Sequence, residues 1–454
     1  MSAYPPPLNI LIVGCSIAGP TLATFLLLSP LPASQKPHIT ILERAPALRP
    51  HGQNIDVRGA GVTILRKLGL LDAVRAATTG EAGVQFVDAA DRVWAAFPAG
   101  RSSGEEEETA AASAAASPTS EFEILRGRFA QLCWRRSEQA SERVRREGGR
   151  GIEFVFGDRL DELEQRGDNK VHVRFAQSGV RRAFDVVVGA DGLQSLTRQM
   201  AWGCEGEGER VKRLGMYGGF FSMPRVGATD TAWRRWYHAP GRRGIMLRPD
   251  GTGERTTVFM AVVKDDDDGD ARLDAAATSG RGGVQVQKEL LREYFADAGW
   301  ESERVVREML ATDDFYYDAI AQVKMESWSK GRVVLVGDAG YCASPISGMG
   351  TTLALSGAYN LAGALLRHPS DPGAAFAVYE DAMRPTVDRA QKLAPGMPHL
   401  LHPQTAWGVW MLNAIMFVLY RSGLLPLLAR FAGPPAHSVP VPDYGFEEFS
   451  EEAL

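Results

Sequence analysis

The sequence predicts a mixed α/β fold in which a parallel-sheet domain is interrupted by an antiparallel-sheet domain. Three observations support this prediction: an apolar strand, a Gly-containing turn and a helix follow one another near the N-terminus, aromatic-rich strands run between residues 216 and 263, and a late buried strand reaches a second Gly-rich loop after residue 336. Alternating strands and helices are typical of parallel sheets, and short strands between Pro and Gly turns are typical of antiparallel sheets. Because the strand–helix pattern returns late, we expect the first domain to be discontinuous in sequence.

The first strand and helix lie in residues 10–28, ILIVGCSIAGPTLATFLLL. Gly14 permits a tight turn after the strand and Gly19 permits close packing of the helix, whereas Ser16 stands where a dinucleotide fingerprint usually has its second glycine. The serine is small, its hydroxyl can donate to a phosphate, and the helix N-terminus adds free N–H groups. The stretch indicates a nucleotide phosphate site, with a turn that binds no ligand as the alternative.

Two further strand ends carry acidic residues. The stretch HITILER ends in Glu43 and Arg44, and an acid at this place accepts hydrogen bonds from the ribose of an adenosine. The buried strand in DVVVGADGLQSLTRQM, residues 185–200, leads to Asp191 and then to Ser195, which is suited to cap the next helix. Asp191 is therefore either a turn residue or a ligand-binding residue.

The late strand in RVVLVGDAGYCASPISGMGTTLAL, residues 332–355, ends at Asp338. A loop with Pro345, Gly348 and Gly350 follows before a helix begins. A carboxylate at a strand end suits a polyol chain, and the two glycines let backbone N–H groups face a polar ligand group. This combination indicates a second part of the same ligand site.

Composition limits the classes of protein. The 454 residues, 45% hydrophobic and 23% charged, suit a globular protein of two or three domains, and the net charge of −5 does not suggest a nucleic-acid partner. The four cysteines show no metal-ligand spacing, so we expect no metal site and a reduced, cytoplasmic environment. They are Cys15, Cys133, Cys204 and Cys342.

Two segments stand apart from the strand–helix pattern. Residues 99–120 are rich in Glu, Ala and Ser, and we expect a disordered insertion there. Residues 406–420 are strongly apolar but are interrupted by Arg421, so they are shorter than the span of about 20 residues that a bilayer needs. We expect a packed or interfacial helix pair, with peripheral membrane contact as the less favoured alternative.

The three turn motifs, in this order, resemble those of group A flavoprotein monooxygenases, the para-hydroxybenzoate hydroxylase-like superfamily. The stretches NILIVGCSIAGP, ERAPALRPHGQNIDVRGAGVTILRKLGLLDAV and GDAGYCASPISGMGTTLAL resemble the branch that includes tetracycline-modifying monooxygenases and microbial tailoring hydroxylases of secondary metabolism. The resemblance implies a Rossmann-like FAD-binding domain interrupted by an antiparallel-sheet substrate domain, with a helical C-terminal region. The implied bounds are 1–79, 121–205 and 313–395 for the FAD-binding domain, 80–98 and 206–312 for the sheet domain, and 396–454 for the helical region.

The resemblance also assigns residues to a cofactor site. Gly14, Ser16 and Gly19 would contact the FAD pyrophosphate, and Glu43 and Arg44 would contact the adenosine. Asp56 and Arg126 would lie on the flavin side, Asp338 would bind the ribityl chain, and Pro345, Gly348 and Gly350 would line the flavin ring. Arg49 is implied in NADPH binding, and Asp191 in binding both FAD and NAD(P)H. The sequence departs from the family at Ser16, at Tyr341, where many members have His, and at Thr352, where Asn is frequent. No second glycine fingerprint is present, so no separate NADPH domain is implied.

The activity that the resemblance implies is hydroxylation of an electron-rich aromatic, phenolic or polyketide-like molecule, with FAD, NAD(P)H and O2, by way of a flavin C4a-hydroperoxide. Epoxidation and Baeyer–Villiger oxygenation use the same flavin chemistry and stay open, and a non-catalytic flavin-binding sensor is the alternative of another class. The segment WRRWYHAP is not the Trp-rich motif of flavin halogenases, which disfavours halogenation. No catalytic base is implied.

We expect the substrate between the flavin and the middle sheet. The candidate residues are Phe220, Phe221, Trp236, Tyr237, His238, Met246 and Arg248. Interleaved aromatic residues on a sheet are also typical of a core, which is the alternative for each of them. Cys342 follows the Gly337-Asp338 turn closely, and we expect an inert thiol there rather than a covalent link to flavin.

Overall fold

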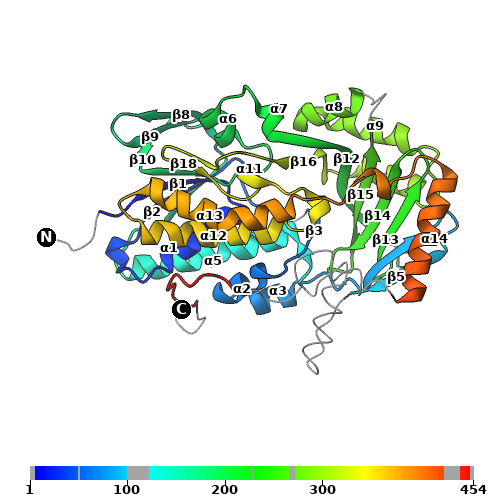
Figure 1. The fold of residues 1–454 in the computed structure, drawn as a ribbon, viewed down its shortest axis with the longest axis horizontal. Helices are drawn as coiled ribbons and strands as arrows, with labels where there is room; N and C mark the ends of the chain where they lie inside the picture. The colour runs from blue at the N-terminus through cyan, green and yellow to red at the C-terminus, as the bar shows by residue number, and fades with distance from the viewer. Residues whose placement is uncertain are drawn as a thin grey trace.

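The structure is a computed structural model that describes residues 6–49, 52–99, 122–227, 229–264, 271–423 and 440–449. It has two lobes, each built around a β-sheet (Figure 1). The insertion predicted over residues 99–120 lies outside the described residues from residue 100 onward.

Among the described residues, the first lobe holds a six-stranded sheet with the order β17, β18, β11, β1, β2, β7. Its strands are β1 (Asn9–Val13), β2 (His38–Glu43), β7 (Ile152–Phe156), β11 (Val186–Gly189), β17 (Ser329–Lys330) and β18 (Val333–Leu335). All neighbours are parallel except β17 and β18. Since β18 pairs with β11 beside β1, the loops after residues 13, 189 and 336 meet at one carboxyl edge of the sheet, where α/β proteins bind their ligands.

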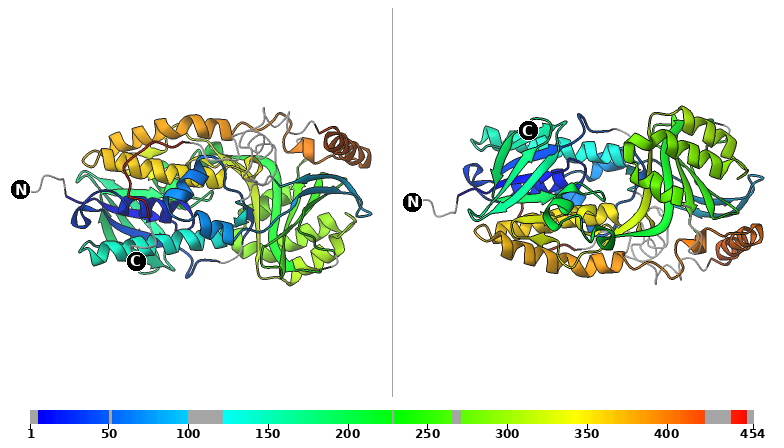
Figure 2. Two further views of the ribbon diagram at one scale, coloured as in Figure 1. Left: turned by 90° about the horizontal axis from the view of Figure 1, so that it is seen from below. Right: turned by 90° about the horizontal axis from the view of Figure 1, so that it is seen from above.

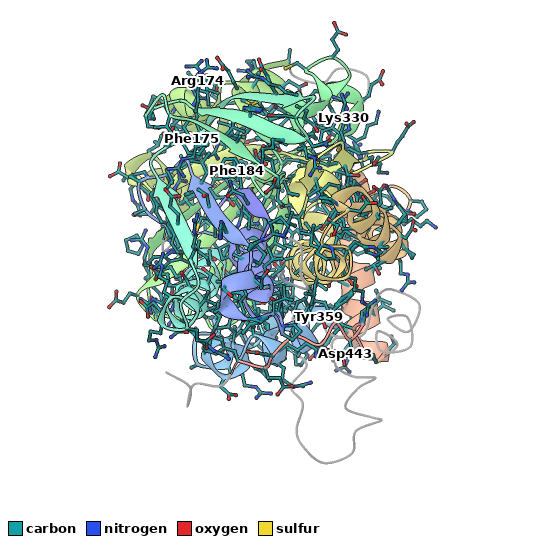
Figure 3. All side chains as sticks on the ribbon, turned by 90° about the vertical axis from the view of Figure 1, so that its left-hand side faces the viewer. Arg174, Phe175, Phe184, Lys330, Tyr359 and Asp443 are labelled. Carbon is teal, nitrogen blue, oxygen red and sulfur yellow. The ribbon has the colours of Figure 1, made fainter. Side chains whose placement is uncertain are left out.

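The two faces of this sheet are covered differently. Ile10 and Ile12 of β1 pack with the helices, whereas Leu11 and Val13 face a small three-stranded sheet. This alternation follows from the two-residue period of a strand. The covering sheet is β8 (Leu160–Arg166), β9 (Lys170–Phe175) and β10 (Arg181–Phe184), and Figure 3 shows Phe175 and Phe184 in this layer. Below the large sheet in Figure 1 lie α1 (Ala18–Leu27), α2 (Ala60–Lys67), α3 (Leu71–Ala76), α5 (Arg126–Arg146), α12 (Gly350–Arg367) and α13 (Pro372–Ala390). Above it, beside the three-stranded sheet, lie α6 (Leu196–Trp202) and α7 (Glu207–Arg210). The first lobe also holds α11 (Asp338–Tyr341) and short 3-10 turns at Ala33–Gln35 and Pro345–Ser347.

The second lobe holds a sheet that has seven strands within the described chain, in the order β16, β12, β15, β14, β13, β4, β5. The strands are β4 (Gly83–Val87), β5 (Val93–Pro98), β12 (Val211–Pro224), β13 (Arg234–Ala239), β14 (Arg243–Pro249), β15 (Arg255–Val263) and β16 (Phe315–Val323). They are antiparallel apart from β13 and β4. One face is covered by α8 (Ala271–Thr278), a 3-10 turn at Gly280–Gly283, α9 (Val284–Phe295) and α10 (Ser302–Ala311), and the other faces the first lobe (Figure 2).

The chain returns to the first lobe later than the predicted boundary at residue 313. Strand β16 pairs with β12 along most of its length and is an edge of the second sheet. The predicted boundary differs because β16 is placed by pairing with a strand that is distant in sequence, and no local sequence pattern predicts such pairing. Two short strands, β3 (Asn54–Ile55) and β6 (Ile124–Leu125), pair with each other between the lobes.

The C-terminal region differs from the prediction of a helical segment over residues 396–454. Its described part contains a 3-10 turn at His399–Leu401 and one α-helix, α14 (Ala406–Ser422), whereas residues 440–449 run without helix over the first lobe. Aromatic packing holds this last stretch, because the Phe446 ring lies 5.1 Å from that of Phe25 and the Tyr359 hydroxyl donates to the Pro442 carbonyl at 2.7 Å. Figure 3 shows Tyr359 and Asp443 close together there. The helix expected after Arg421 falls outside the described residues.

Helix α14 lies at the far end of the second lobe, against β5 (Figure 1). Its inner side packs through Met416 and Leu419 on the sheet, and its outer side leaves Trp407 and Trp410 exposed. In the described part of the chain, no helix combines the length and the apolar character that crossing a membrane requires.

Candidate active site

A cavity of about 550 Å³ lies between the two lobes. First-lobe turns form one wall, the open face of the seven-stranded sheet forms the opposite wall, and the connection before α14 closes part of the rim. The cavity is lined by residues from all three parts. They include Ser16, Asp56, Arg126, Asp338, Ser344, Pro345, Gly348 and Gly350 from the first lobe, Phe220, Arg234, Trp236, Met246 and Arg248 from the sheet, and Met397, Leu401 and His402 from the connection.

The turn between β1 and α1 requires both of its glycines. Gly14 has a φ of +113°, and a Cβ on it would lie 2.4 Å from the Ala190 carbonyl oxygen. A Cβ on Gly19 would lie 2.1 Å from the carbonyl oxygen of Gly14, so the helix approaches the strand as closely as the backbone allows. No side chain in the described chain caps α1, and Ser16 lines the cavity at the helix start. The first N–H groups of the helix are therefore available to an anion.

The acidic residue at the end of β2 is anchored to this turn. Glu43 accepts a hydrogen bond from the Cys15 backbone N–H at 3.0 Å through one carboxylate oxygen and from the Ala45 N–H at 2.9 Å through the other. The neighbouring Arg44 and the later Arg49 are both exposed, and they lie, as Glu43 does, outside the set of described residues that line the cavity. Geometry at the cavity wall thus gives no support for Arg44 or Arg49 as direct ligand contacts.

Asp191 serves the local fold through its side chain. Its carboxylate accepts hydrogen bonds from the Ser195 hydroxyl at 2.5 Å and from the backbone and side chain of Thr197 at 3.0 Å each. Ser195 in turn caps α6 by accepting from the Arg198 N–H at 2.9 Å. Of the two roles that the sequence left open for Asp191, the geometry supports the turn residue. Its neighbour Gly192 lines the cavity.

The third turn brings a carboxylate to a helix N-terminus. Gly337 has a φ of +67°, which is the left-handed region that favours glycine, and Asp338 follows it at the cavity wall. A Cβ on Gly350 would lie 3.8 Å from a carboxylate oxygen of Asp338, so the start of α12 and the carboxylate face the same space. Pro345 and Gly348 line the cavity beside them.

On the sheet wall, alternate side chains point into the cavity and away from it. Trp236, Met246 and Arg248 line the cavity. Tyr237 instead packs in the core beneath α9 and α10 and donates to the Ala298 carbonyl, so the geometry gives no support for it as a substrate contact. The reason is the two-residue period of β13, which places Trp236 and Tyr237 on opposite faces.

Two other predicted substrate residues also occupy buried positions. The Phe221 side chain belongs to the same core as Tyr237, although the residue borders the cavity, and its neighbour Phe220 faces the cavity side. His238 is fully buried behind Trp236, with ring centroids 5.4 Å apart, and is outside the described cavity lining. Phe220 stacks between Phe259, at 4.4 Å, and Tyr316, at 4.7 Å, which gives this wall a flat aromatic surface.

Four charged side chains form an Arg–Glu cluster at the cavity: the buried Glu81 and Glu123 and the half-buried Arg234 and Arg248. Arg234 lies 2.9 Å from a Glu81 oxygen and 3.0 Å from a Glu123 oxygen. Arg248 pairs with Glu81 at 2.9 Å and also with Glu123. Asn54 donates to Glu123 at 2.8 Å. The formal charges cancel, which offsets the cost of burying the two carboxylates.

The pKa values of the two carboxylates of the cluster are shifted in opposite directions. Burial raises the pKa of Glu81 above its ordinary value, although the nearby Arg248 acts in the opposite direction. For Glu123 burial acts in the same upward sense, but the charges of Arg248 and Arg234 overcome it and hold the pKa below its ordinary value. Protonation of Glu81 would leave the cluster with a net positive charge toward the cavity.

The geometry can be compared with known proteins. Residues 8–390 match the family described as FAD binding domain. The chain is 34% identical to the FAD-dependent monooxygenase asL6 of Sarocladium schorii, over 97% of this chain and 99% of that protein. The chain belongs to the FAD-dependent monooxygenases. It is also 33% identical to Monooxygenase CTB7 of Cercospora beticola, over 90% of this chain and 92% of that one. The crystal structure of the tetracycline destructase Tet(55) superposes with a TM-score of 0.70 at 28% identity, covering 96% of this chain and 99% of that one.

The residues of this monooxygenase fit its cofactor. Gly348 and Gly350 of the third turn leave open space at the cavity wall, and α1 offers an uncapped N-terminus. Ser344, a non-glycine residue with a φ of +73°, lines the cavity, and its buried hydroxyl has no hydrogen-bond partner within the described residues. Strained backbone and an unpaired buried hydroxyl are costly unless a ligand uses them. The cavity is therefore built for a polar ligand such as FAD.

Several cavity residues of the monooxygenase were missed by sequence reasoning. Arg234 could have been found, because it stands two residues before Trp236 on the same strand and shares its face. Tyr316, Asn54 and His402 carry no local signal, since each comes from a segment that reaches the cavity only through distant pairing.

Proposed function

We propose that the protein hydroxylates an electron-rich aromatic or polyketide-like small molecule, with FAD as cofactor and NAD(P)H and O2 as co-substrates. The observation that carries this proposal is the continuity of one cavity from the FAD-type turns to an aromatic and charged sheet wall. Support for the substrate class comes from the relatives: the destructases are named for tetracycline, a polycyclic polyketide.

In the proposed complex, this chain holds the cofactor through its turns. Ser16 and the α1 N-terminus would receive the pyrophosphate, and Glu43 would receive the adenosine ribose. Asp338 would receive the ribityl chain, while Pro345, Gly348 and Gly350 would lie along the ring, with the Ser344 hydroxyl as a further donor or acceptor. Bound FAD supplies hydride acceptance from NAD(P)H and the activation of O2.

The second wall would position the substrate. Trp236 and the stacked Phe220 offer flat apolar surfaces for an aromatic ring system and exclude water from it. The Arg–Glu cluster presents guanidinium donors from Arg234 and Arg248 on the same wall. An oxygen-rich aromatic molecule offers acceptors to these donors and an apolar face to the rings.

A direct experiment measures coupled turnover. The protein is loaded with FAD, and NADPH oxidation, O2 consumption and product mass are followed with a panel of phenols, naphthols and hydroxyanthraquinones under ¹⁸O2. Substrate-stimulated NADPH oxidation with one ¹⁸O atom in a hydroxylated product supports the proposal. A ring-expanded or epoxide product would support the alternative oxygenations. A flavin-bound protein that consumes no O2 with any of these compounds would contradict an oxygenase and favour a sensor.

A further inference from the structure

Residues 440–449, which we call the C-terminal strap, lie across helices of the first lobe without forming a helix or a strand of their own. Tyr444 is buried, and its ring fits against α12 only because residue 363 is glycine: a Cβ on Gly363 would lie 2.2 Å from the ring. The Tyr444 hydroxyl donates to the buried Asn360 side chain at 2.9 Å. The Arg367 guanidinium carbon lies 4.5 Å from the centre of the same ring. These contacts form a specific slot for one aromatic side chain.

The strap also contacts α1 and α5. The Glu447 backbone N–H donates to the carbonyl of Leu28, at the C-terminal end of α1, at 2.9 Å. The Glu447 carboxylate lies 2.7 Å from the Arg143 guanidinium, near the C-terminal end of α5. Further along the strap, the Phe449 ring centre lies 3.9 Å from the guanidinium carbon of Arg136, also on α5. One segment of ten residues therefore joins three helices.

The same three helices begin at the cavity. Ser16 lies at the start of α1, Arg126 is the first residue of α5, and Gly350 is the first residue of α12. All three residues line the cavity. Helices α1 and α12 also pack directly on each other, with the Phe25 and Tyr359 rings 4.9 Å apart. The cofactor site and the strap thus lie toward opposite ends of one group of packed helices.

This arrangement has an energetic consequence. A packed helix moves as a rigid element, so contacts that fix its C-terminal part also restrict its N-terminus. If the strap is released, the N-termini that receive the cofactor gain freedom, and FAD must order them again when it binds. A coupling free energy between two sites is reciprocal, so the release of the strap must also become harder once FAD is bound.

We propose that the C-terminal strap and FAD bind to this protein cooperatively. Docking of residues 440–449 on α1, α5 and α12 holds the helix N-termini in the arrangement that receives FAD, and FAD binding in turn favours the docked strap. The strap is thereby a device for cofactor retention. This inference goes beyond the proposed function, because it concerns only the cofactor and does not depend on the substrate.

The first test follows hydrogen exchange in the unmodified, full-length protein with and without saturating FAD. Strap amides that exchange by local release do so faster than the amides of the buried strand β1, which exchange only on global unfolding. We expect this fast exchange of the strap, and we expect FAD to slow it about tenfold, within the range typical of coupled sites. A strap that is as slow as β1 in the absence of FAD, or whose exchange FAD leaves unchanged, would overturn the proposal.

The second test measures the dissociation constant of FAD by fluorescence titration of the apoprotein. Gly363→Ala places a methyl group in the slot of the ring and suits a helix at least as well as glycine does, whereas Tyr444→Ala removes the ring. Neither residue is among the described residues that line the cavity. Each substitution should raise the dissociation constant about tenfold. Val305→Ala, in the core beneath the second sheet, weakens packing away from the strap and should leave the dissociation constant unchanged.

The double variant Gly363→Ala/Tyr444→Ala identifies the cause. Once the ring is absent the slot has no occupant, so Gly363→Ala should add no further loss to Tyr444→Ala. Additive losses would place the effect in α12 itself and would overturn the proposal, as would unchanged dissociation constants in both single variants. If Tyr444→Ala does not fold, Gly363→Ala and the exchange of the unmodified protein still decide.

These measurements are separate from the test of the proposed function. A protein that shows the coupling but oxygenates no compound with NADPH and O2 would support the strap and contradict the hydroxylase. A protein that hydroxylates a substrate while FAD does not change the exchange of the strap would support the hydroxylase and contradict the strap.

Discussion

Glu43 and Cys15 are joined by a 3.0 Å hydrogen bond in which the Cys15 backbone N–H donates to the Glu43 carboxylate. The bond connects the end of β2 to the turn that follows β1, although 28 residues separate the two positions. It fixes the carboxylate beside the N-terminus of α1, and the second oxygen is fixed by Ala45. A carboxylate held this way is preorganised for a diol, because its position is set before any ligand arrives.

From this relationship we predict that Glu43→Ala weakens FAD binding about 10- to 100-fold, the range for loss of hydrogen bonds to a charged group. Glu43→Gln, which keeps one acceptor oxygen, should lose less. The measurement is a fluorescence titration of the apoprotein with FAD, with circular dichroism to verify folding. Glu142→Ala, at an exposed position on α5, is the matched control. An unchanged dissociation constant for Glu43→Ala would refute the assignment of Glu43 to the cofactor.

The Arg–Glu cluster leads to a prediction about stability. Arg248→Met leaves Glu81 and Glu123 buried with a single guanidinium between them, and breaking a buried ionic arrangement costs about 3–5 kcal/mol. We expect a corresponding loss in the free energy of unfolding, measured by urea denaturation of the FAD-loaded protein. Arg166→Met removes an exposed pair with Glu164 and should cost less than about 1 kcal/mol.

A second substitution tests whether charge is the cause. Adding Glu81→Gln to Arg248→Met removes one negative charge and brings the buried charges back into balance. The double variant should therefore recover part of the lost stability, in a double-mutant cycle. If the two substitutions were simply additive, the loss would come from packing and not from unpaired charge.

Features that depend on residues close together in the sequence could be predicted, whereas features that depend on distant residues could not. The turn glycines were predictable because their constraint is set by neighbours within a few residues, as Gly14 and Gly19 show. Strand alternation was available too, and it would have excluded Tyr237 once Trp236 was placed at the cavity. His402 could not be predicted, since it reaches β14 only through the path of the chain after α13. Likewise, no pattern near Glu123 in the sequence predicts its pairing with Arg248.

Because two histidines are buried, we predict that the free energy of unfolding decreases in acid. Burial, with smaller contributions from the charges of His399 and Arg242 and against the hydrogen bond to Pro398, lowers the pKa of His402 to about 4. Burial also lowers the pKa of His238 well below its ordinary value. In the unfolded chain both histidines titrate near about pH 6.5. Below that pH the unfolded state binds more protons than the folded state, so stability falls as the pH decreases. For His402 the loss runs from about pH 6.5 to about 4 and reaches about 3 kcal/mol.

The measurement is the free energy of unfolding at a series of pH values between neutral and about pH 4. His402→Gln should flatten the decline, because glutamine cannot take up a proton. His368→Gln replaces a half-buried histidine outside the cavity and should leave the slope as it is. A decline of the same steepness in His402→Gln and in the unchanged protein would show that other groups cause it.

Cysteine reactivity gives the last prediction. Cys204 is exposed, whereas Cys15, Cys133 and Cys342 are buried. Burial raises the pKa of Cys133 to about 12 and the pKa values of Cys15 and Cys342 above their ordinary range, so little reactive thiolate is present at neutral pH. A disulfide-exchange reagent such as DTNB should therefore label one thiol in the native protein and all four in denaturant. Cys204→Ser should abolish the native reaction. Rapid labelling of a second thiol, or flavin that stays attached to the chain after denaturation, would contradict an inert Cys342 at the cavity wall.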